Sequence, residues 1–271
     1  MISFEQFKLL FSGPLVRNAL IVGILLSVTA ALLGVSLVLK KYSMIGDGLS
    51  HVSFGAMAVA VAMGKAPLAF ALPVVIVAAF LLLRVSEKSR VKGDAAVAVV
   101  STASLAVGAI ASRGMNVDIE GFMFGSIVSV TASDVILTVT VTLLTLLLYV
   151  LCYHRIFAVT FDETYTKATG GKPALYNAMI AVMTAVTVVV GMRLVGSLLI
   201  SALVIFPALS SMRLFKSFRA VVLSSGVISV VTFILALFVS ILFDISTSAC
   251  IVLLDLSVFG IATLIGTVRK A

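Results

Sequence analysis

Residues 40–51 read KKYSMIGDGLSH and open an apolar segment that continues to residue 63. Asp47 and His51 are four residues apart, so in a helix both side chains project from one face, with Ser43 and Ser50 close to that face. A carboxylate and an imidazole on one face suit a divalent metal such as zinc or manganese. The alternative is a local hydrogen-bonded pair near a helix N-terminus, where the helix dipole favours a carboxylate. Both interpretations predict a helix that begins in this stretch.

The rest of the chain has the composition of a membrane protein. Hydrophobic residues make up 62% of the 271 residues, charged residues only 11%, and the mean hydropathy is +1.28. Ionisable groups inside a membrane are costly and usually mark an ion or substrate pathway, which favours the metal interpretation of Asp47 and His51. Cys152 and Cys250 lie in apolar segments and are expected to be packing residues. We predict an all-α, polytopic integral membrane protein with a single domain, residues 1–271.

Apolar segments separated by polar connections predict eight or nine membrane helices. The segments are residues 14–39, 44–63, 66–83, 95–111, 134–152, 174–192, 195–212, 220–243 and 247–267. The seventh contains Pro207, which removes a backbone donor and is expected to bend or break the helix near Ile205. Because it also carries Ser197 and Ser201, it is a candidate gate beside a pore. The alternative is a static, kinked packing helix.

Lysine and arginine predict the orientation. With an outside N-terminus, 14 of the 19 fall on the inner side and 5 on the outer side, as the positive-inside rule requires. The inner set is Lys40, Lys41, Arg84, Lys88, Arg90, Lys92, Arg155, Lys167, Lys172, Arg213, Lys216, Arg219, Arg269 and Lys270; the outer set is Lys8, Arg17, Lys65, Arg113 and Arg193. The basic residues behind the net charge of +8 are therefore topology signals, and we expect the partner to be membrane lipid, not nucleic acid.

Two long connections carry further predictions. In the outer loop 113–133, the stretch GFMFGSIVS is expected to form a short surface or re-entrant helix, and Asp118, Glu120 and Asp134 are expected to be solvated. The alternative for these acids is reception of a cation from outside. The inner loop 153–173 predicts a short amphipathic helix over residues 161–168, ended by Gly170 and Gly171. It is either a docking element for a cytoplasmic partner or a connector against lipid headgroups.

Three stretches resemble the permease subunits of bacterial ABC importers for zinc, manganese and iron. Residues 45–64, IGDGLSHVSFGAMAVAVAMG, resemble the family pattern L-K/R-K/R-x-S-x-x-G-D-A-L-S-H-A; FDETYTKATG (161–170) is similar to FDPExAxxxG; and VGSLLISALVIFPALSSM (195–212) is similar to VGxLLVxALLIxPAxxA. The chain departs from these patterns at Gly48, Thr164, Thr166, Ser210 and Ser211. The resemblance spans essentially the whole chain.

The resemblance implies a type II ABC importer-like permease in the bacterial cytoplasmic (inner) membrane. Two permease copies would lie above a pair of cytoplasmic ATPase subunits and receive metal from an external binding protein. The loop 153–173 would be the coupling loop, with Phe161, Asp162, Glu163 and Gly170 as its coupling residues. The chain has no GxxxxGK[ST] phosphate loop, so it is not expected to be an enzyme, and the metal would be cargo, not a bound cofactor.

One Asp47 and one His51 are too few for a four-coordinate site. A two-fold axis would bring two of each together as an O2N2 set, in a homodimer or in a heterodimer with a related permease. Zinc, manganese and ferrous iron all suit such donors. The alternative function is an ion-coupled secondary transporter, with Asp255 as a proton carrier instead of a hydrogen-bonded packing residue. An intramembrane enzyme is disfavoured because HExxH and GxSxG are absent from the sequence.

Overall fold

The computed structural model describes residues 13–88, 93–113, 131–243 and 245–268. Throughout these ranges the regular elements are helices, and nine of them are long and apolar enough to cross a membrane. The nine are α2 (Pro14–Leu39), α3 (Ser43–Ala62), α4 (Pro67–Lys88), α5 (Gly93–Ala111), α7 (Ala132–Leu151), α10 (Pro173–Val195), α11 (Ser197–Leu214), α12 (Phe218–Phe243) and α13 (Thr247–Val268). The predicted all-α membrane fold is confirmed. Helices are favoured because each satisfies its own backbone hydrogen bonds, as the bilayer core requires.

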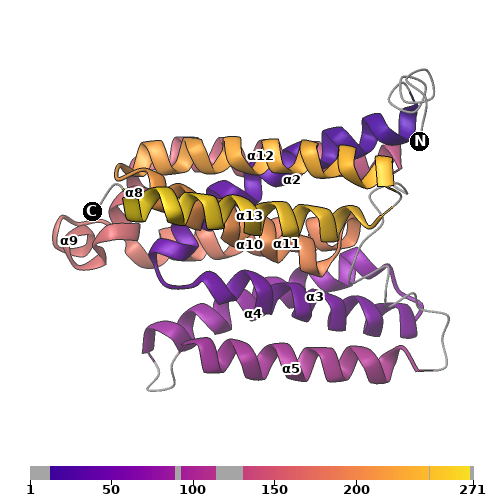
Figure 1. Cartoon of the computed structure of the whole chain (residues 1–271). Helices are drawn as coiled ribbons and strands as arrows, with labels where there is room; N and C mark the ends of the chain where they lie inside the picture. The colour runs from indigo at the N-terminus through magenta and orange to yellow at the C-terminus, as the bar shows by residue number, and fades with distance from the viewer. Residues whose placement is uncertain (1–12, 89–92, 114–130, 244, 269–271) are drawn as a thin grey trace.

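The helices lie side by side along a common direction (Figure 1). On one side α2 packs against α7 and α12, and on the other α3 packs against α4 and α5. Between them lie α10, α11 and α13, and α11 contacts both α2 and α3. Helix α2 begins and helix α13 ends at opposite ends of the bundle (Figure 1).

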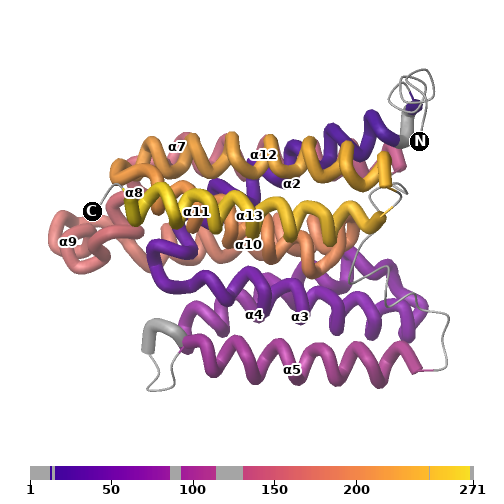
Figure 2. Tube along the Cα trace, in the orientation of Figure 1, coloured from indigo at the N-terminus to yellow at the C-terminus, as the bar shows by residue number. Residues whose placement is uncertain are grey.

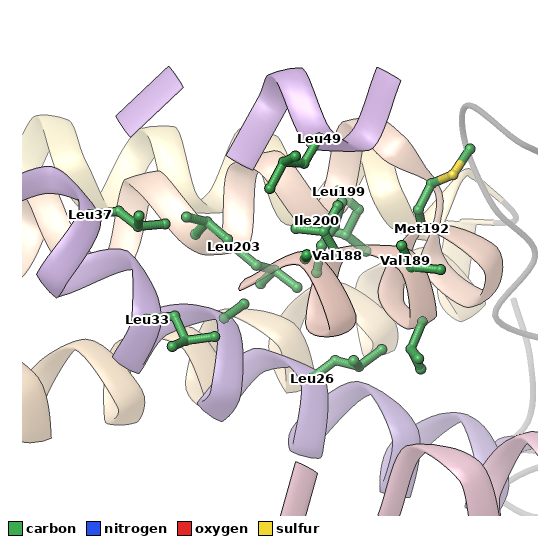
Figure 3. Packing of buried hydrophobic residues seen from close by; sticks show 14 of the residues in the cluster. Leu26, Leu33, Leu37, Leu49, Val188, Val189, Met192, Leu199, Ile200 and Leu203 are labelled. Atoms are coloured by element: carbon green, nitrogen blue, oxygen red, sulfur yellow. The ribbon is translucent and has the colours of Figure 1, made fainter. Parts of the chain in front are cut away.

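The core lies where α2, α3, α10 and α11 meet. Figure 3 shows Leu26 and Leu33 of α2 and Leu49 of α3 directed toward the buried residues of α10 and α11. These four helices are largely buried, whereas α4, α5 and α13 are largely exposed. Association in lipid depends on close packing, and Gly34 of α2 provides it at the backbone of α11. This packing holds α11 against α2, and α3 also packs against α11.

The seventh predicted segment differs from expectation. The structure has an unbroken helix, α11, from Ser197 to Leu214 with Pro207 inside it, so a break near Ile205 does not occur, and the alternative of a bend there stays a prediction. Pro207 is buried, and the surrounding helices hold α11 in shape through the proline. The turn before α11 is a single residue, Gly196, with φ 87° and ψ 162°. Only glycine adopts this conformation readily, which allows α10 to lead directly into α11.

The inner loop contains two helices, α8 (Tyr153–Phe161) and α9 (Glu163–Ala168), instead of one over residues 161–168. Asp162 between them is extended, and its Oδ1 accepts a hydrogen bond of 2.8 Å from the Tyr165 N–H, which caps α9. Gly170, with φ 79°, follows the end of α9 as predicted. Figure 2 places α8 and α9 at the end of the bundle where α13 ends. We call this the basic end because the α2–α3 connection, with Lys40 and Lys41, also lies there.

The outer loop remains largely a prediction. The stretch GFMFGSIVS, Asp118 and Glu120 lie outside the described residues. Asp134 is described and is not solvated as expected. It is buried at the start of α7, where it forms a capping box with Thr131, and its Oδ1 lies 3.2 Å from Arg193 Nη2. The pairing with Arg193 explains how a buried carboxylate is tolerated at this position.

Candidate metal site and coupling end

Asp47 and His51 share one face of α3, as the spacing predicted. His51 Nε2 lies 3.5 Å from Asp47 Oδ2, and the Asp47 and His51 side chains are 35% and 21% exposed. Two ligand atoms each about 2.1 Å from a tetrahedral metal are ~3.4 Å apart, so this separation suits a shared ion. The His51 Nδ1 atom is buried and has no hydrogen-bond partner within the described ranges. Nε2 is therefore the nitrogen available to a metal.

Serines from α3 and α11 adjoin this pair. The Ser50 hydroxyl donates a hydrogen bond of 2.7 Å to the Asp47 carbonyl oxygen and lies 3.4 Å from Ser201 Oγ. The Ser201 hydroxyl also interacts with the Asp47 carboxylate. Of the three gate candidates, Ser201 is thus the one placed beside Asp47. Ser197 is buried and accepts a hydrogen bond from Ser201 through its carbonyl, and Pro207 lies further along α11.

Exposed and half-exposed positions recur every three or four residues on both helices. We define the α3–α11 face as Met44, Asp47 and His51 of α3 together with Leu198, Ser201 and Ile205 of α11. Such spacing places each set on one side of its helix. Groups of three or more His, Cys, Asp or Glu side chains that could hold a metal are absent from the described residues. The face of one protomer therefore supplies two strong ligands, and an ion there needs further donors.

Aromatic side chains gather at the basic end. Phe157 and Phe161 of α8 and Phe218 of α12 stack with ring centroids 4.9–5.9 Å apart. Phe157, Phe161 and Tyr165 are exposed, and so is Asp162. Large apolar groups exposed outside the membrane-crossing segments commonly mark a surface that binds another protein.

Glu163, in contrast, has partners within the chain. Its Oε1 accepts hydrogen bonds from Lys40 Nζ and from Asn177 Nδ2, the latter at 2.9 Å. Burial favours the neutral form of Glu163, but the hydrogen bonds from Lys40 and Asn177 and the Lys40 charge outweigh it, so the pKa of Glu163 lies below its ordinary value. Sequence reasoning missed Lys40 and Asn177. From the sequence, Lys40 was noted only as one of the basic residues that predict the orientation in the membrane.

Asp255 of α13 does not make the expected packing hydrogen bond. It is 1% exposed, and neither carboxyl oxygen has a hydrogen bond of good geometry within the described part of the chain. Thr232 of α12 is its polar neighbour. Cys152 and Cys250 are free thiols, and Cys250 is buried.

The comparisons with known proteins agree with this architecture. The model of the ABC 3 transport family matches residues 12–266. The manganese transport system membrane protein MntC of Halalkalibacterium halodurans is 26% identical over 94% of this chain and 89% of its own length. The probable iron transport system membrane protein of Haemophilus influenzae is 27% identical over 93% of this chain and 94% of its own.

A solved structure agrees as well. PsaBC from Streptococcus pneumoniae in complex with Fab superimposes with a TM-score of 0.85 at 27% identity, covering 94% of this chain and 93% of the PsaBC chain. The match extends over nearly all of both chains. The resemblance found in the sequence motifs is confirmed, and the chain belongs to the ABC 3 transport family.

Proposed function

We propose that this chain is the permease subunit of an ATP-driven importer of a divalent transition metal, manganese foremost, and that Asp47 and His51 bind the metal in transit. The observation that carries the proposal is the 3.5 Å separation of Asp47 Oδ2 and His51 Nε2 on a partly exposed face. The names of the relatives, which specify manganese and iron transport, support the choice of ion. Manganese accepts carboxylate oxygen together with imidazole nitrogen.

A second permease copy would complete the site. Two α3–α11 faces related by a two-fold axis would present two Asp47 carboxylates and two His51 imidazoles to one ion, and water would supply the remaining positions. Such a site is weaker than a closed structural site, which suits an ion that must leave again. A homodimer would meet this requirement because each copy presents the same face.

The basic end would face the cytoplasm and bind the ATPase subunits. Phe161, Asp162 and Tyr165 are exposed there and would contact the ATPase, while Glu163 supports α9 from within the permease. An external metal-binding protein would deliver the ion at the opposite end. The chain lacks a phosphate loop, so the energy would come entirely from the ATPase subunits.

The test is uptake of radioactive manganese by liposomes that contain the permease with its ATPase subunits, supplied with the binding protein and internal ATP. Asp47→Asn and His51→Gln should each lower uptake about tenfold or more, because each replaces a metal ligand with an amide side chain of similar size that binds the metal more weakly. Met44→Leu is the matched control on the same face. Uptake near wild type in both ligand variants would contradict the site. Uptake driven by an ion gradient with a disabled ATPase would instead indicate a secondary transporter.

A further inference from the structure

One carboxylate joins three helices at the basic end. Glu163 is the first residue of α9, Lys40 directly follows α2, and Asn177 lies near the start of α10. Lys40 Nζ donates to Glu163 and also to Asn177 Oδ1, the latter at 2.5 Å, while Asn177 Nδ2 donates to Glu163. The three side chains thus form a closed triangle. The Lys40 side chain is only 6% exposed, so its ammonium depends on these two acceptors.

Lys40 and Asn177, the two donors to Glu163, are each connected through the chain to a helix of the α3–α11 face. After Lys40, only Lys41 and Tyr42 precede α3, which carries Asp47. Lys41 has φ 62°, a left-handed conformation that costs a lysine about 1–2 kcal/mol, so the surrounding contacts must hold this short connection in place. After Asn177, α10 continues through Gly196 into α11, which carries Ser201.

The triangle is not part of the family pattern described above. In FDPExAxxxG the position of Glu163 is proline, and the glutamate falls at the position of Thr164. Here the acid stands one residue earlier, at the first position of α9, where it reaches Lys40 and Asn177. Proline is also acceptable at the first position of a helix, and the extended conformation of Asp162 is the one favoured before proline. Glu163→Pro is therefore a variant that removes the carboxylate while α9 is preserved.

Building on the function proposed above, we propose that Glu163 is a positioning residue that transmits displacement of α9 to the α3–α11 face. When the ATPase subunits move α9, the triangle carries the α2–α3 connection and the start of α10 with it. Separation of the triangle would leave the nearly buried Lys40 ammonium without its carboxylate, which is strongly unfavourable. The three elements therefore move together, and the motion reaches Asp47 through α3 and Ser201 through α10 and α11.

The experiment uses the assembled complex of the permease with its ATPase subunits and needs no metal. The background carries Cys152→Ser and Cys250→Ser, and Ile205→Cys introduces a single thiol on the α3–α11 face. The rate at which this thiol reacts with a small thiol reagent is measured with and without ATP and vanadate. The ATP-dependent change in rate should fall severalfold in Glu163→Gln, Glu163→Pro and Lys40→Met, while complex assembly and ATPase activity persist. Thr164→Ala, an exposed neighbour on α9, is the matched control and should respond as the parent does.

Double variants show whether Glu163 and Lys40 act through their contact with each other or affect the response independently. Glu163→Gln with Lys40→Met should lose no more of the response than the worse single variant, and the exchange Glu163→Lys with Lys40→Glu should restore part of it. Full responses in the assembled single variants, or losses that multiply in the double variant, would overturn the proposal. The reporter does not depend on the cargo. A parent complex that shows the link but takes up neither manganese, zinc nor ferrous iron would refute the proposed function and leave the role of Glu163 standing.

Discussion

Replacing Gly34 with alanine should destabilise the protein by overpacking α2 against α11. An ideal Cβ on Gly34 lies 1.8 Å from the Val204 carbonyl oxygen and 2.8 Å from its carbon. Ordinary contacts begin near 3.4 Å, so the two backbones would have to separate by about 1.5 Å. The obstacle is a helical carbonyl that cannot rotate aside. Overpacking of this kind lowers the free energy of unfolding by about 1–3 kcal/mol, and it would also displace the neighbouring turn of α11 with Ser201.

Thermal unfolding in detergent measures this effect. The chain has no tryptophan, but buried Cys250 becomes accessible to a thiol-reactive dye on unfolding. The controls are Gly226→Ala in α12 and Gly260→Ala in α13, where nothing lies within 4 Å of the added Cβ. These should unfold at or above the wild-type temperature, because alanine favours a helix over glycine by about 1 kcal/mol. Gly34→Ala should unfold lower by roughly 2–4 °C for each kcal/mol lost, and a midpoint equal to the controls would refute the close approach.

Three further predictions concern the basic end and α11. Single cysteines at Asp162 and Tyr165, in a background without Cys152 and Cys250, should react with an impermeant thiol reagent only from the cytoplasmic side; labelling of intact cells would invert the topology. Pro207→Ala should lower the metal moved per ATP hydrolysed while the complex stays assembled, and unchanged coupling would reduce Pro207 to a packing residue. Because the folded-state pKa of Glu163 is below its ordinary value, its stabilising contribution is present above that ordinary value and is lost as the pH falls through the folded pKa. The difference in unfolding temperature between wild type and Glu163→Gln should persist from about pH 7 to pH 5 and shrink only below about pH 4; a difference that disappears by about pH 6 would contradict the lowered pKa.

The features that the sequence predicted correctly depend on local rules. A long apolar segment in lipid has to be helical, so the nine helices that are long enough to cross a membrane in the described part of the chain follow from composition. Asp47 and His51 share a face because a helix brings residues four apart together, and the structure places them as this rule requires. Pro207 shows the limit of a local rule, because burial of α11 against its neighbours outweighs the tendency of proline to interrupt a helix.

The errors arise where a segment or a charge has a distant partner. Helix α8 follows α7 after a single residue, Cys152, and the sequence assigned all of its residues to the inner loop that follows the crossing segment. For Asp134, the capping box with Thr131 is visible as a local motif. Its ion pair with Arg193 is not, because it joins the start of α7 to the end of α10. Asp134 was expected to be solvated because the loop was considered without the helix that carries Arg193.

Glu163 and Lys40 illustrate the same limit at the basic end. An acid in a polar loop is ordinarily solvated, and a lysine next to a membrane helix is ordinarily a topology signal, so each residue had a sufficient explanation by itself. The two are 123 positions apart, and only the packing of α9 beside the α2–α3 connection reveals them as partners. The positive charge of Lys40 therefore has two roles. It adds to the excess of basic residues on the predicted inner side, and it holds α9 through its contact with Glu163. A substitution that preserves the inner charge, such as Lys41→Ala with an added lysine elsewhere in the loop, would leave the anchor intact, whereas Lys40→Ala with the same compensation would not.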